Sequence, residues 1–365
     1  MIKLHYPKFW QSKNILAYLL LPFGYIYLFL GVIRKLLAKP IKFKARTICI
    51  GNATVGGTGK TQLVIKLAQE LTKCNVDFII LSKGYGGKNS HYSLVTSTSS
   101  PYDVGDEALE LCEYGRTFAV PKIVYAAEII EKYKPDIVLI DDGMQNPNFI
   151  KDFVIMTVDG SRGFGNELPI PAGPMRSRIE DIKADAIVVV GGVVVKNNVI
   201  PVENNVIPAK AGIQSYKSLD SRLRGNDNMT FHATIKPVRA PSKLKYYAFA
   251  GIGNPDKFFD TLRNAGADVV ETQSFPDHYS YTKSDILELI EDAKSKGLRL
   301  ITTRKDYVKI RHVFYEQKLD LRELAAEMVE GPEKSCVTPE LQIDYLEIDL
   351  EVDRIKGLVD KIIAL

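Results

Sequence analysis

The sequence predicts an α/β protein built on a largely parallel sheet, with a second, smaller C-terminal α/β domain and an N-terminal membrane-associating helical arm. Three observations predict this fold class. Apolar runs of strand length alternate with amphipathic helical stretches, a Gly- and Thr-rich loop joins the first such strand to the first helix, and a long uncharged segment precedes them both. A length of 365 residues is sufficient for two domains of ordinary size.

The composition is that of a folded globular protein. Hydrophobic residues make up 45% and charged residues 25% of the chain, with 26 Gly and 18 Pro, which excludes the disordered, collagen-like and coiled-coil classes. The four cysteines lie far apart and form no C-x-x-C pair, which argues against a zinc site and a disulfide framework and favours a reducing compartment. The five histidines form no H-x-x-x-H pair, so we expect no metal cage made of protein ligands alone.

Residues 1–45 are predicted to form a basic hydrophobic arm. The net charge of +4 is unevenly distributed, because residues 1–46 carry nine Lys or Arg and no Asp or Glu, whereas the remainder is mildly acidic. Residues 14–33 contain no charge, and as a helix these 20 residues would span ~30 Å, the hydrocarbon thickness of a bilayer. No small-residue cleavage site follows the run, which argues against a signal peptide.

Three arrangements of this arm are open. Pro22 and Gly24 interrupt the run, and its tyrosines are suited to a membrane interface. The arm is then either a spanning anchor or a kinked helical pair that lies in the cytoplasmic leaflet and is held to anionic lipid by Lys and Arg. The third arrangement is a buried hairpin that packs on the globular part. The basic excess favours membrane association and leaves spanning undecided.

Residues 46–235 are predicted to form the main domain. The alternation of strands and helices indicates a parallel sheet covered on both faces. The expected strands are 46–51, 76–81, 137–140, 153–158 and 186–190, and the expected helices are 60–73 and 126–133.

Residues 197–228 interrupt the main domain. They are polar, contain Asn-Asn-Val-Ile-Pro twice and have no usable apolar period. The end of this stretch resembles a mobile palindromic repeat element translated within a reading frame. We therefore assign the insert no function; a basic binding loop is the alternative.

Residues 236–365 are predicted to form the smaller C-terminal α/β domain. The expected strands are 246–250 and 298–303, and the expected helices are 254–265, which Asn254 would cap, and 284–293. The last 40 residues show no pattern that predicts their structure.

The strongest functional signal is the loop between the first strand and the first helix, Thr54-Val-Gly-Gly-Thr-Gly-Lys-Thr61. It matches a phosphate-binding P-loop, with Thr54 in place of the first Gly, and so predicts a P-loop NTPase-type domain. The glycines let successive N–H groups face a phosphate at the start of the helix. Lys60 would bridge the β- and γ-phosphates, and Thr61 would ligate Mg²⁺. The predicted nucleotide-binding residues are Thr54, Val55, Gly56, Gly57, Thr58, Gly59, Lys60 and Thr61.

Two carboxylates follow the apolar strand 137–140. Asp141 and Asp142 would stand at the carboxyl edge of a parallel sheet, where ligands bind in open α/β folds. One of them would share Mg²⁺ with Thr61, and the other would help to position the bound groups or to neutralise charge at the site. The alternative is a solvated turn, since Asp-Asp-Gly is also good turn chemistry. These motifs predict a nucleoside triphosphate with Mg²⁺ and do not identify the acceptor.

Further motifs follow the P-loop in a fixed order: Asp103-Val-Gly-Asp106-Glu107, Asp141-Asp-Gly-Met-Gln145, Pro171-Ala-Gly-Pro-Met-Arg176, Ala248-Phe-Ala-Gly-Ile-Gly-Asn-Pro255 and Phe275-Pro-Asp-His278. With these motifs and the P-loop, the chain resembles the tetraacyldisaccharide 4′-kinases, or lipid A 4′-kinases. The resemblance runs from the arm to about residue 310, apart from the insert.

The resemblance implies ATP- and Mg²⁺-dependent phosphorylation of the 4′-hydroxyl of a tetraacylated glucosamine disaccharide 1-phosphate. The product would be lipid IVA, formed in lipid A biosynthesis at the cytoplasmic face of the bacterial inner membrane. The active site would lie between the two domains. The implied partners are the glycolipid and the membrane, with no nucleic acid and no protein partner.

The resemblance also implies two catalytic residues. Asp106 matches the family's catalytic base, and His278 matches its partner in a dyad that orients the base. By themselves, Asp106 would be read as a helix cap and His278 as an exposed histidine.

Three departures from the family pattern bear on this transfer. Ser177 stands where the family has a Glu implicated in holding Mg²⁺, so that Glu180 or water would have to replace it. Lys83 stands where the family has an arginine; it keeps the positive charge but cannot bind a phosphate in the bidentate way of a guanidinium. Arg304 stands for a glutamate, a charge reversal without an evident consequence in the sequence.

The alternative function is a membrane-tethered P-loop ATPase or GTPase, acting as a switch or transport motor without a lipid acceptor. A guanine-specific switch should show Asn-Lys-x-Asp, and a transport ATPase should show a Leu-Ser-Gly-Gly-type signature. Neither string occurs. A third reading, a pseudoenzyme damaged by the insert, conflicts with the retained catalytic residues.

Overall fold

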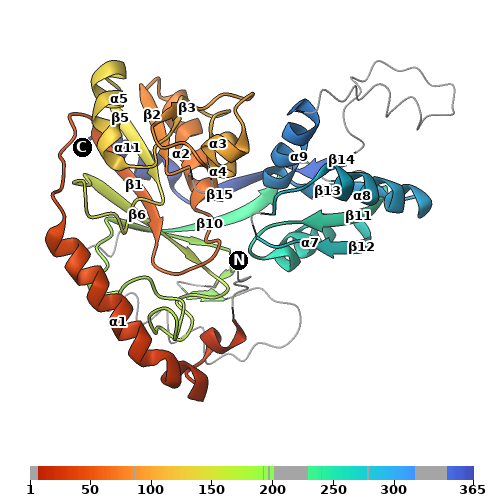
Figure 1. Cartoon of the computed structure of the whole chain (residues 1–365), viewed down its shortest axis with the longest axis horizontal. Helices are drawn as coiled ribbons and strands as arrows, with labels where there is room; N and C mark the ends of the chain where they lie inside the picture. The colour runs from red at the N-terminus through yellow and green to blue at the C-terminus, as the bar shows by residue number, and fades with distance from the viewer. Residues whose placement is uncertain are drawn as a thin grey trace.

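The structure, a computed structural model, describes residues 7–84, 87–191, 193–195, 198–200, 229–239, 241–277, 279–316 and 343–365. Two α/β bodies lie side by side, and a long N-terminal helix runs along the edge of the first (Figure 1). This arrangement confirms the predicted fold class.

The first body is built on a nine-stranded sheet with the order β15-β10-β7-β6-β1-β5-β2-β4-β3. The strands from β10 to β4 are parallel, and the two edge strands, β15 and β3, are antiparallel to their neighbours. The bounds are β1 Arg46–Asn52, β2 Phe78–Ser82, β3 Ser93–Leu94, β4 Thr117–Ala119, β5 Ile137–Asp141, β6 Phe153–Asp159, β7 Ala186–Val190, β10 Thr230–Pro237 and β15 Ile348–Val352. The five strands expected here are confirmed within two residues at either end.

Helices cover both faces of this sheet because successive residues of a central strand point to opposite sides. In β1, Ile48 and Ile50 pack with α2 and α11, whereas Cys49 packs with α5 on the other face. The helical elements of this body are η1 Lys8–Gln11, α2 Lys60–Lys73, α3 Pro101–Val104, α4 Asp106–Leu111, η2 Ile123–Tyr125, α5 Ala126–Tyr133, η3 Ile179–Asp181 and α11 Ile355–Ile363.

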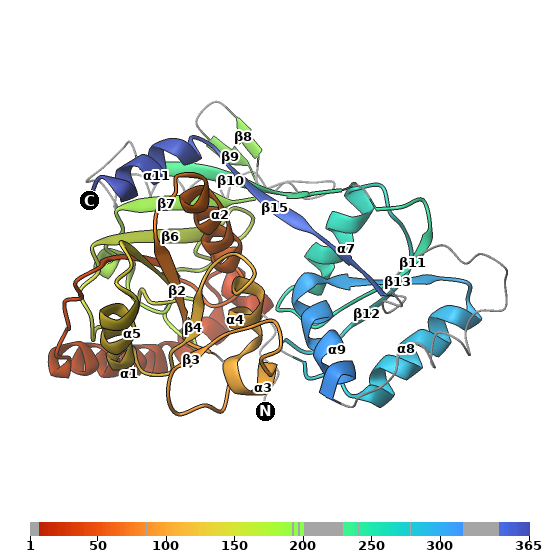
Figure 2. The same cartoon turned by 90° about the horizontal axis from the view of Figure 1, so that it is seen from above.

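The second body contains a parallel four-stranded sheet with the order β12-β11-β13-β14. Its strands are β11 Lys245–Ala250, β12 Asp268–Ser274, β13 Arg299–Thr303 and β14 Ile343–Leu346, and its helices are α7 Pro255–Asn264, α8 Lys283–Ser295 and α9 Arg304–Glu316. Asn254 caps α7 as expected, because its side chain accepts a hydrogen bond from the backbone N–H of Lys257. Figure 2 shows α9 of this body facing α4 of the first.

The chain crosses between the bodies twice, and this corrects the predicted C-terminal domain, 236–365. The last strand and helix, β15 and α11, return to the first body, where β15 pairs with β10. The pairing continues outside the sheet, since the N–H of Val238 donates to the carbonyl of Glu347. β15 was not predicted because a five-residue strand has little local signal and its partner lies more than 100 residues away in the sequence.

The predicted insert, 197–228, falls largely outside the described residues. Residues 198–200 form the short strand β9, Asn198–Ile200, which pairs antiparallel with β8, Val193–Val195. Residues 197 and 201–228 lie outside the part that the structure describes.

The arm forms one continuous helix, α1, Ile15–Leu37, with Pro22 inside it, so the predicted kinked pair is wrong. A buried hairpin is also wrong, because most of the large apolar side chains of α1 are exposed. One narrow face packs on the first body. There Gly24 lies so close to Pro169 that a Cβ would approach it to 2.7 Å, and the Tyr27 hydroxyl donates to the Arg176 carbonyl at 3.2 Å. The helix is long and apolar enough to cross a membrane.

Candidate active site

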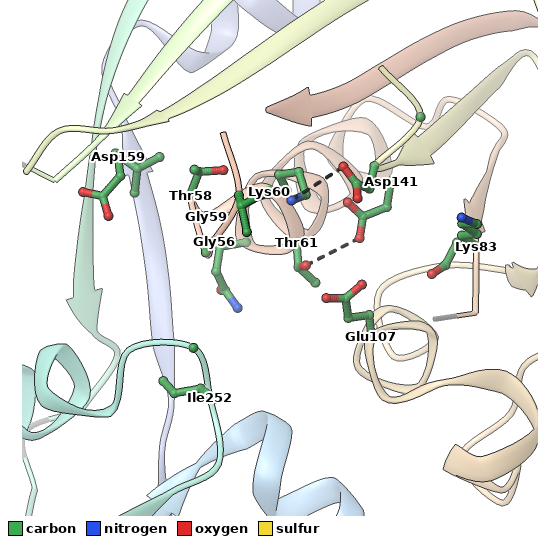
Figure 3. A pocket seen from close by; sticks show the side chains of 18 of the residues that line it. Gly56, Thr58, Gly59, Lys60, Thr61, Lys83, Glu107, Asp141, Asp159 and Ile252 are labelled. Atoms are coloured by element: carbon green, nitrogen blue, oxygen red, sulfur yellow. Dashed lines mark hydrogen bonds and ion pairs between the residues drawn. The ribbon is translucent and has the colours of Figure 1, made fainter. Parts of the chain in front are cut away.

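The P-loop lies at the carboxyl end of β1 and leads into α2, whose N-terminus faces a cleft of about 2330 Å³ between the two bodies. Gly56 and Gly59 have φ angles of 111° and 83°, a conformation that side chains with a Cβ rarely adopt. The loop and the helix therefore present backbone N–H groups to any anion in the cleft. Figure 3 shows Lys60 and Thr61 at the start of α2 on one side of this cleft and Ile252 of the second body on the other.

Seven of the eight predicted nucleotide-binding residues line the cleft, namely 55–61. Thr54 does not line it. Its side chain is buried, and its backbone forms an isolated bridge with Met175. The hydroxyl of Thr58 is also engaged, at 2.7 Å from the hydroxyl of Thr157. Thr54 thus anchors the loop through its backbone, and Thr58 both lines the cleft and anchors the loop through its hydroxyl.

The two aspartates after β5 have different environments. Asp142 lies 3.6 Å from Lys60 Nζ. Both of its carboxylate oxygens accept hydrogen bonds from Arg176 Nη1, Oδ1 at 3.0 Å and Oδ2 at 3.2 Å. Burial opposes ionisation of Asp142, but Lys60 and Arg176 outweigh it and lower the pKa of this carboxyl. Asp142 is therefore an ion-pair partner of the P-loop lysine.

Asp141 faces Thr61, whose hydroxyl lies 3.5 Å from Asp141 Oδ2 (Figure 3). Its other oxygen, Oδ1, is buried and has no hydrogen-bond partner among the described residues. Burial, followed by the nearby Glu107, raises the pKa of Asp141 to about 8. An orphaned carboxylate oxygen beside a P-loop hydroxyl fits a divalent cation. Within the described ranges, no group of three or more His, Cys, Asp or Glu side chains could hold a metal.

Asp106 is the first residue of α4 and follows Gly105, whose φ is 83°. Its carboxylate is buried between two lysines of the second body, with Oδ2 at 3.4 Å from Lys305 Nζ and 3.3 Å from Lys309 Nζ. Asp106 does not itself line the cleft, whereas its neighbour Glu107 does. His278 lies outside the described residues, so its predicted meeting with Asp106 stays a prediction.

Sequence reasoning missed three charged residues of this site. Glu107 points toward Thr61 and Asp141 (Figure 3). Lys305 lines the cleft, and although burial lowers its pKa, Asp106 and Glu107 raise it above the ordinary value on balance. Lys309 stands one helical turn later on α9. The spacing Lys-x-x-x-Lys, which places both ammonium groups on one helix face, was the available signal.

The structure also bears on the departures from the family pattern. Glu180 is exposed in η3 and does not line the cleft, so it does not occupy the position of a metal ligand. Arg304 joins the bodies, because it donates to the Tyr114 hydroxyl at 2.6 Å, pairs with Glu113 and lies 3.6 Å from Glu347. The positive charge of Arg304, which stands for a glutamate of the family, is thus matched by two acidic residues where the two bodies meet. Lys83 lines the cleft.

Comparison with known proteins shows the family of this chain. The family model described as tetraacyldisaccharide-1-P 4′-kinase matches residues 16–338. The tetraacyldisaccharide 4′-kinase of Rickettsia canadensis (strain McKiel) is 45% identical over 311 residues, covering 85% of this chain and 89% of that protein. That of Rickettsia akari (strain Hartford) is 44% identical over 312 residues, with the same coverage.

The fold is likewise that of a solved structure. The crystal structure of LpxK from Aquifex aeolicus in complex with ATP matches with a TM-score of 0.65 and 24% identity, and the match covers 96% of this chain and 99% of that one. The resemblance that the ordered motifs predicted is confirmed by the family match and the relatives. The chain belongs to the tetraacyldisaccharide-1-P 4′-kinase family.

Proposed function

We propose that this chain transfers the γ-phosphoryl group of ATP to the 4′-hydroxyl of a tetraacylated glucosamine disaccharide 1-phosphate, forming lipid IVA in lipid A biosynthesis. The observation that carries the proposal is one cleft that is lined by the P-loop, the metal-type carboxylate Asp141 and the basic end of the N-terminal helix. Membership of the kinase family supports the same reaction.

The nucleotide side of the cleft has the parts that phosphoryl transfer needs. Lys60 and the N–H groups of the loop would hold the β- and γ-phosphates. Thr61 and Asp141 would hold Mg²⁺, which supplies neutralisation of the charge on the phosphates. Asp142 would orient Lys60, since the two already form an ion pair in this structure.

The acceptor hydroxyl must lose its proton as phosphorus arrives. We propose that Asp106 accepts this proton as the general base and that His278 orients Asp106. Asp106 directly precedes Glu107, which lines the cleft, so the proposed base adjoins the cleft wall.

The acceptor side of the cleft reaches the N-terminal helix. Tyr27, Arg34 and Leu37 of α1 line the cleft together with Lys39, which follows the helix. A glycolipid could therefore enter from a membrane in which its acyl chains remain. We place the chain at the cytoplasmic face of the bacterial inner membrane, where ATP is available and anionic lipid attracts Lys and Arg.

We further propose that α1 lies in the membrane interface and does not span. Gly24 and Tyr27, near the middle of the helix, contact the first body. A spanning helix would place its middle at the bilayer centre and carry polar parts of that body with it, at a cost of several kcal/mol per unsatisfied backbone group. An interfacial helix leaves its exposed apolar face to the acyl chains.

This placement predicts that changing Phe23 and Leu30 to Glu lowers binding to vesicles of phosphatidylethanolamine and phosphatidylglycerol about tenfold or more. Both side chains are exposed on α1, and each buried apolar side chain contributes ~1.5–3 kcal/mol. Vesicle co-sedimentation measures the effect. The matched control is Val270→Glu, an exposed apolar residue on β12 of the second body, which should bind as the parent does. Equal binding by the double variant would contradict the placement.

The reaction itself is tested with purified protein, [γ-³²P]ATP, Mg²⁺ and the tetraacyl disaccharide 1-phosphate in detergent micelles. We expect label in the lipid at the 4′ position, and its loss when the metal is chelated by EDTA. A chain that hydrolyses ATP equally fast with and without the acceptor, and labels no lipid, would instead be the tethered ATPase or GTPase.

A further inference from the structure

Two lysines of the second body contact Asp106 of the first, and Lys309 is the more deeply buried of them. Lys309 lies in the second turn of α9, and only 8% of its side chain is exposed. Its Nζ is 3.3 Å from Asp106 Oδ2 and 3.3 Å from Asp306 Oδ1, so the ammonium lies between a carboxylate of each body. A buried lysine is costly unless it is paired in this way. Figure 2 shows the two helices that meet here, α4 and α9.

Asp306 fixes the position of this lysine within the second body. Its side chain is fully buried, and its Oδ2 accepts from the Gly251 N–H at 2.9 Å and from the Thr303 hydroxyl at 2.8 Å. Gly251 follows β11 and Thr303 ends β13, so both donors stand at the carboxyl edge of the second sheet. Lys309 is thereby held by that edge.

The two lysines that contact Asp106 differ in one respect. Lys305 lines the cleft and also lies 3.6 Å from Glu107, so it is placed to contact a bound substrate. Lys309 does not line the cleft, and within the part of the chain that the structure describes it forms ion pairs with Asp106 and Asp306. Lys309 can therefore act on the cleft only indirectly, and Asp106 is its partner in the first body.

We propose that Lys309 is a positioning residue for Asp106, which it holds ionised and in place from the carboxyl edge of the second sheet. This inference rests on the proposed function, in which Asp106 removes the acceptor proton. It makes correct placement of the base depend on the approach of the second body, because the lysine and its anchor belong to that body.

The test is the pH dependence of kcat/KM in Lys309→Met, which keeps the length of the side chain and removes its charge. The charged groups that face Asp106 include Lys305 and Lys309 on α9 and Glu107 on α4, and Asp277 and Glu110 also act on Lys305. Because the ionised carboxylate loses one cation, the acid limb of the profile should move about one pH unit upward. We expect kcat to fall about tenfold at neutral pH, with KM for ATP unchanged. Lys309→Arg should restore the profile in part.

Two further measurements separate this role from a structural one. The matched control is Lys66→Met, since Lys66 is also largely buried and paired with a carboxylate, Asp349, but away from the cleft lining. It should leave the pH profile unchanged. In an Asp106→Asn background, Lys309→Met should cost no further activity, because there is no carboxylate left to position.

The outcomes distinguish the two proposals. If Asp106→Asn keeps its activity, the assignment of the base fails and the inference fails with it. If Asp106→Asn is inactive while Lys309→Met shows the parental pH profile, the base stands and the positioning role is overturned. If Lys309→Met lowers activity by the same factor in the Asp106→Asn background as in the parent, Lys309 acts on stability and the positioning role is overturned. The thermal unfolding midpoint of each variant would confirm this independently.

Discussion

Replacing Lys60 with alanine is expected to lower kcat by about 100-fold or more while the protein stays folded. The expected loss is large because Lys60 would meet the charge that develops on the transferred phosphoryl group, where one preorganised donor contributes 10²–10³-fold, roughly 2.7–4 kcal/mol. Folding should be spared because Asp142, the partner that Lys60 leaves behind, keeps its two hydrogen bonds from Arg176. Steady-state phosphoryl transfer and a thermal unfolding midpoint measure the two effects.

The matched control for this variant is Lys73→Ala. Lys73 ends the same helix, α2, and is largely exposed beside Glu70. Since a surface ion pair contributes ~0–1 kcal/mol, this variant should keep the parental rate and stability. A Lys60→Ala enzyme with near-parental turnover would remove the P-loop assignment.

Replacing Asp106 with asparagine, or His278 with alanine, is expected to lower the rate by ~10²–10⁴-fold, the contribution of a positioned general base. The two residues are 172 positions apart in the sequence. If they act as one dyad, the double variant should be little slower than the slower single variant. Losses that multiply in the double variant would mean that the residues act independently.

ATP affinity distinguishes proton transfer from nucleotide binding in these variants. Neither residue belongs to the P-loop, and Asp106 lies between two lysines of the second body. The dissociation constant for ATP, measured by equilibrium dialysis, should therefore stay within about twofold of the parental value. Weaker binding in either single variant would move that residue to the nucleotide site.

Much of the fold could be predicted because its signals are local. The strand before the P-loop, helix α2 and helix α5 were expected at 46–51, 60–73 and 126–133, and they are observed at Arg46–Asn52, Lys60–Lys73 and Ala126–Tyr133. Each is specified by apolar spacing within its own residues. The nucleotide loop was found for the same reason, as its glycines and Gly-Lys-Thr ending are contiguous.

The rest depends on residues that meet only in three dimensions. β15 pairs with β10 across more than 100 positions, and no local feature of residues 348–352 identifies that partner. The arm could be recognised as basic and apolar, but only the structure shows that it is one continuous helix and not a kinked pair. The contacts of Gly24 and Tyr27 then fix it on the first body.

The sequence by itself determined the α/β class, the P-loop and the family, because these follow from periodicity and from ordered short motifs. Only the tertiary structure decided which charged side chains pair with one another. It pairs Lys60 with Asp142, leaves an oxygen of Asp141 without a hydrogen-bond partner among the described residues, and brings Lys309 to Asp106 from another body. The physical reason is that electrostatic partnership depends on distance and burial, which the order of residues along a chain does not contain.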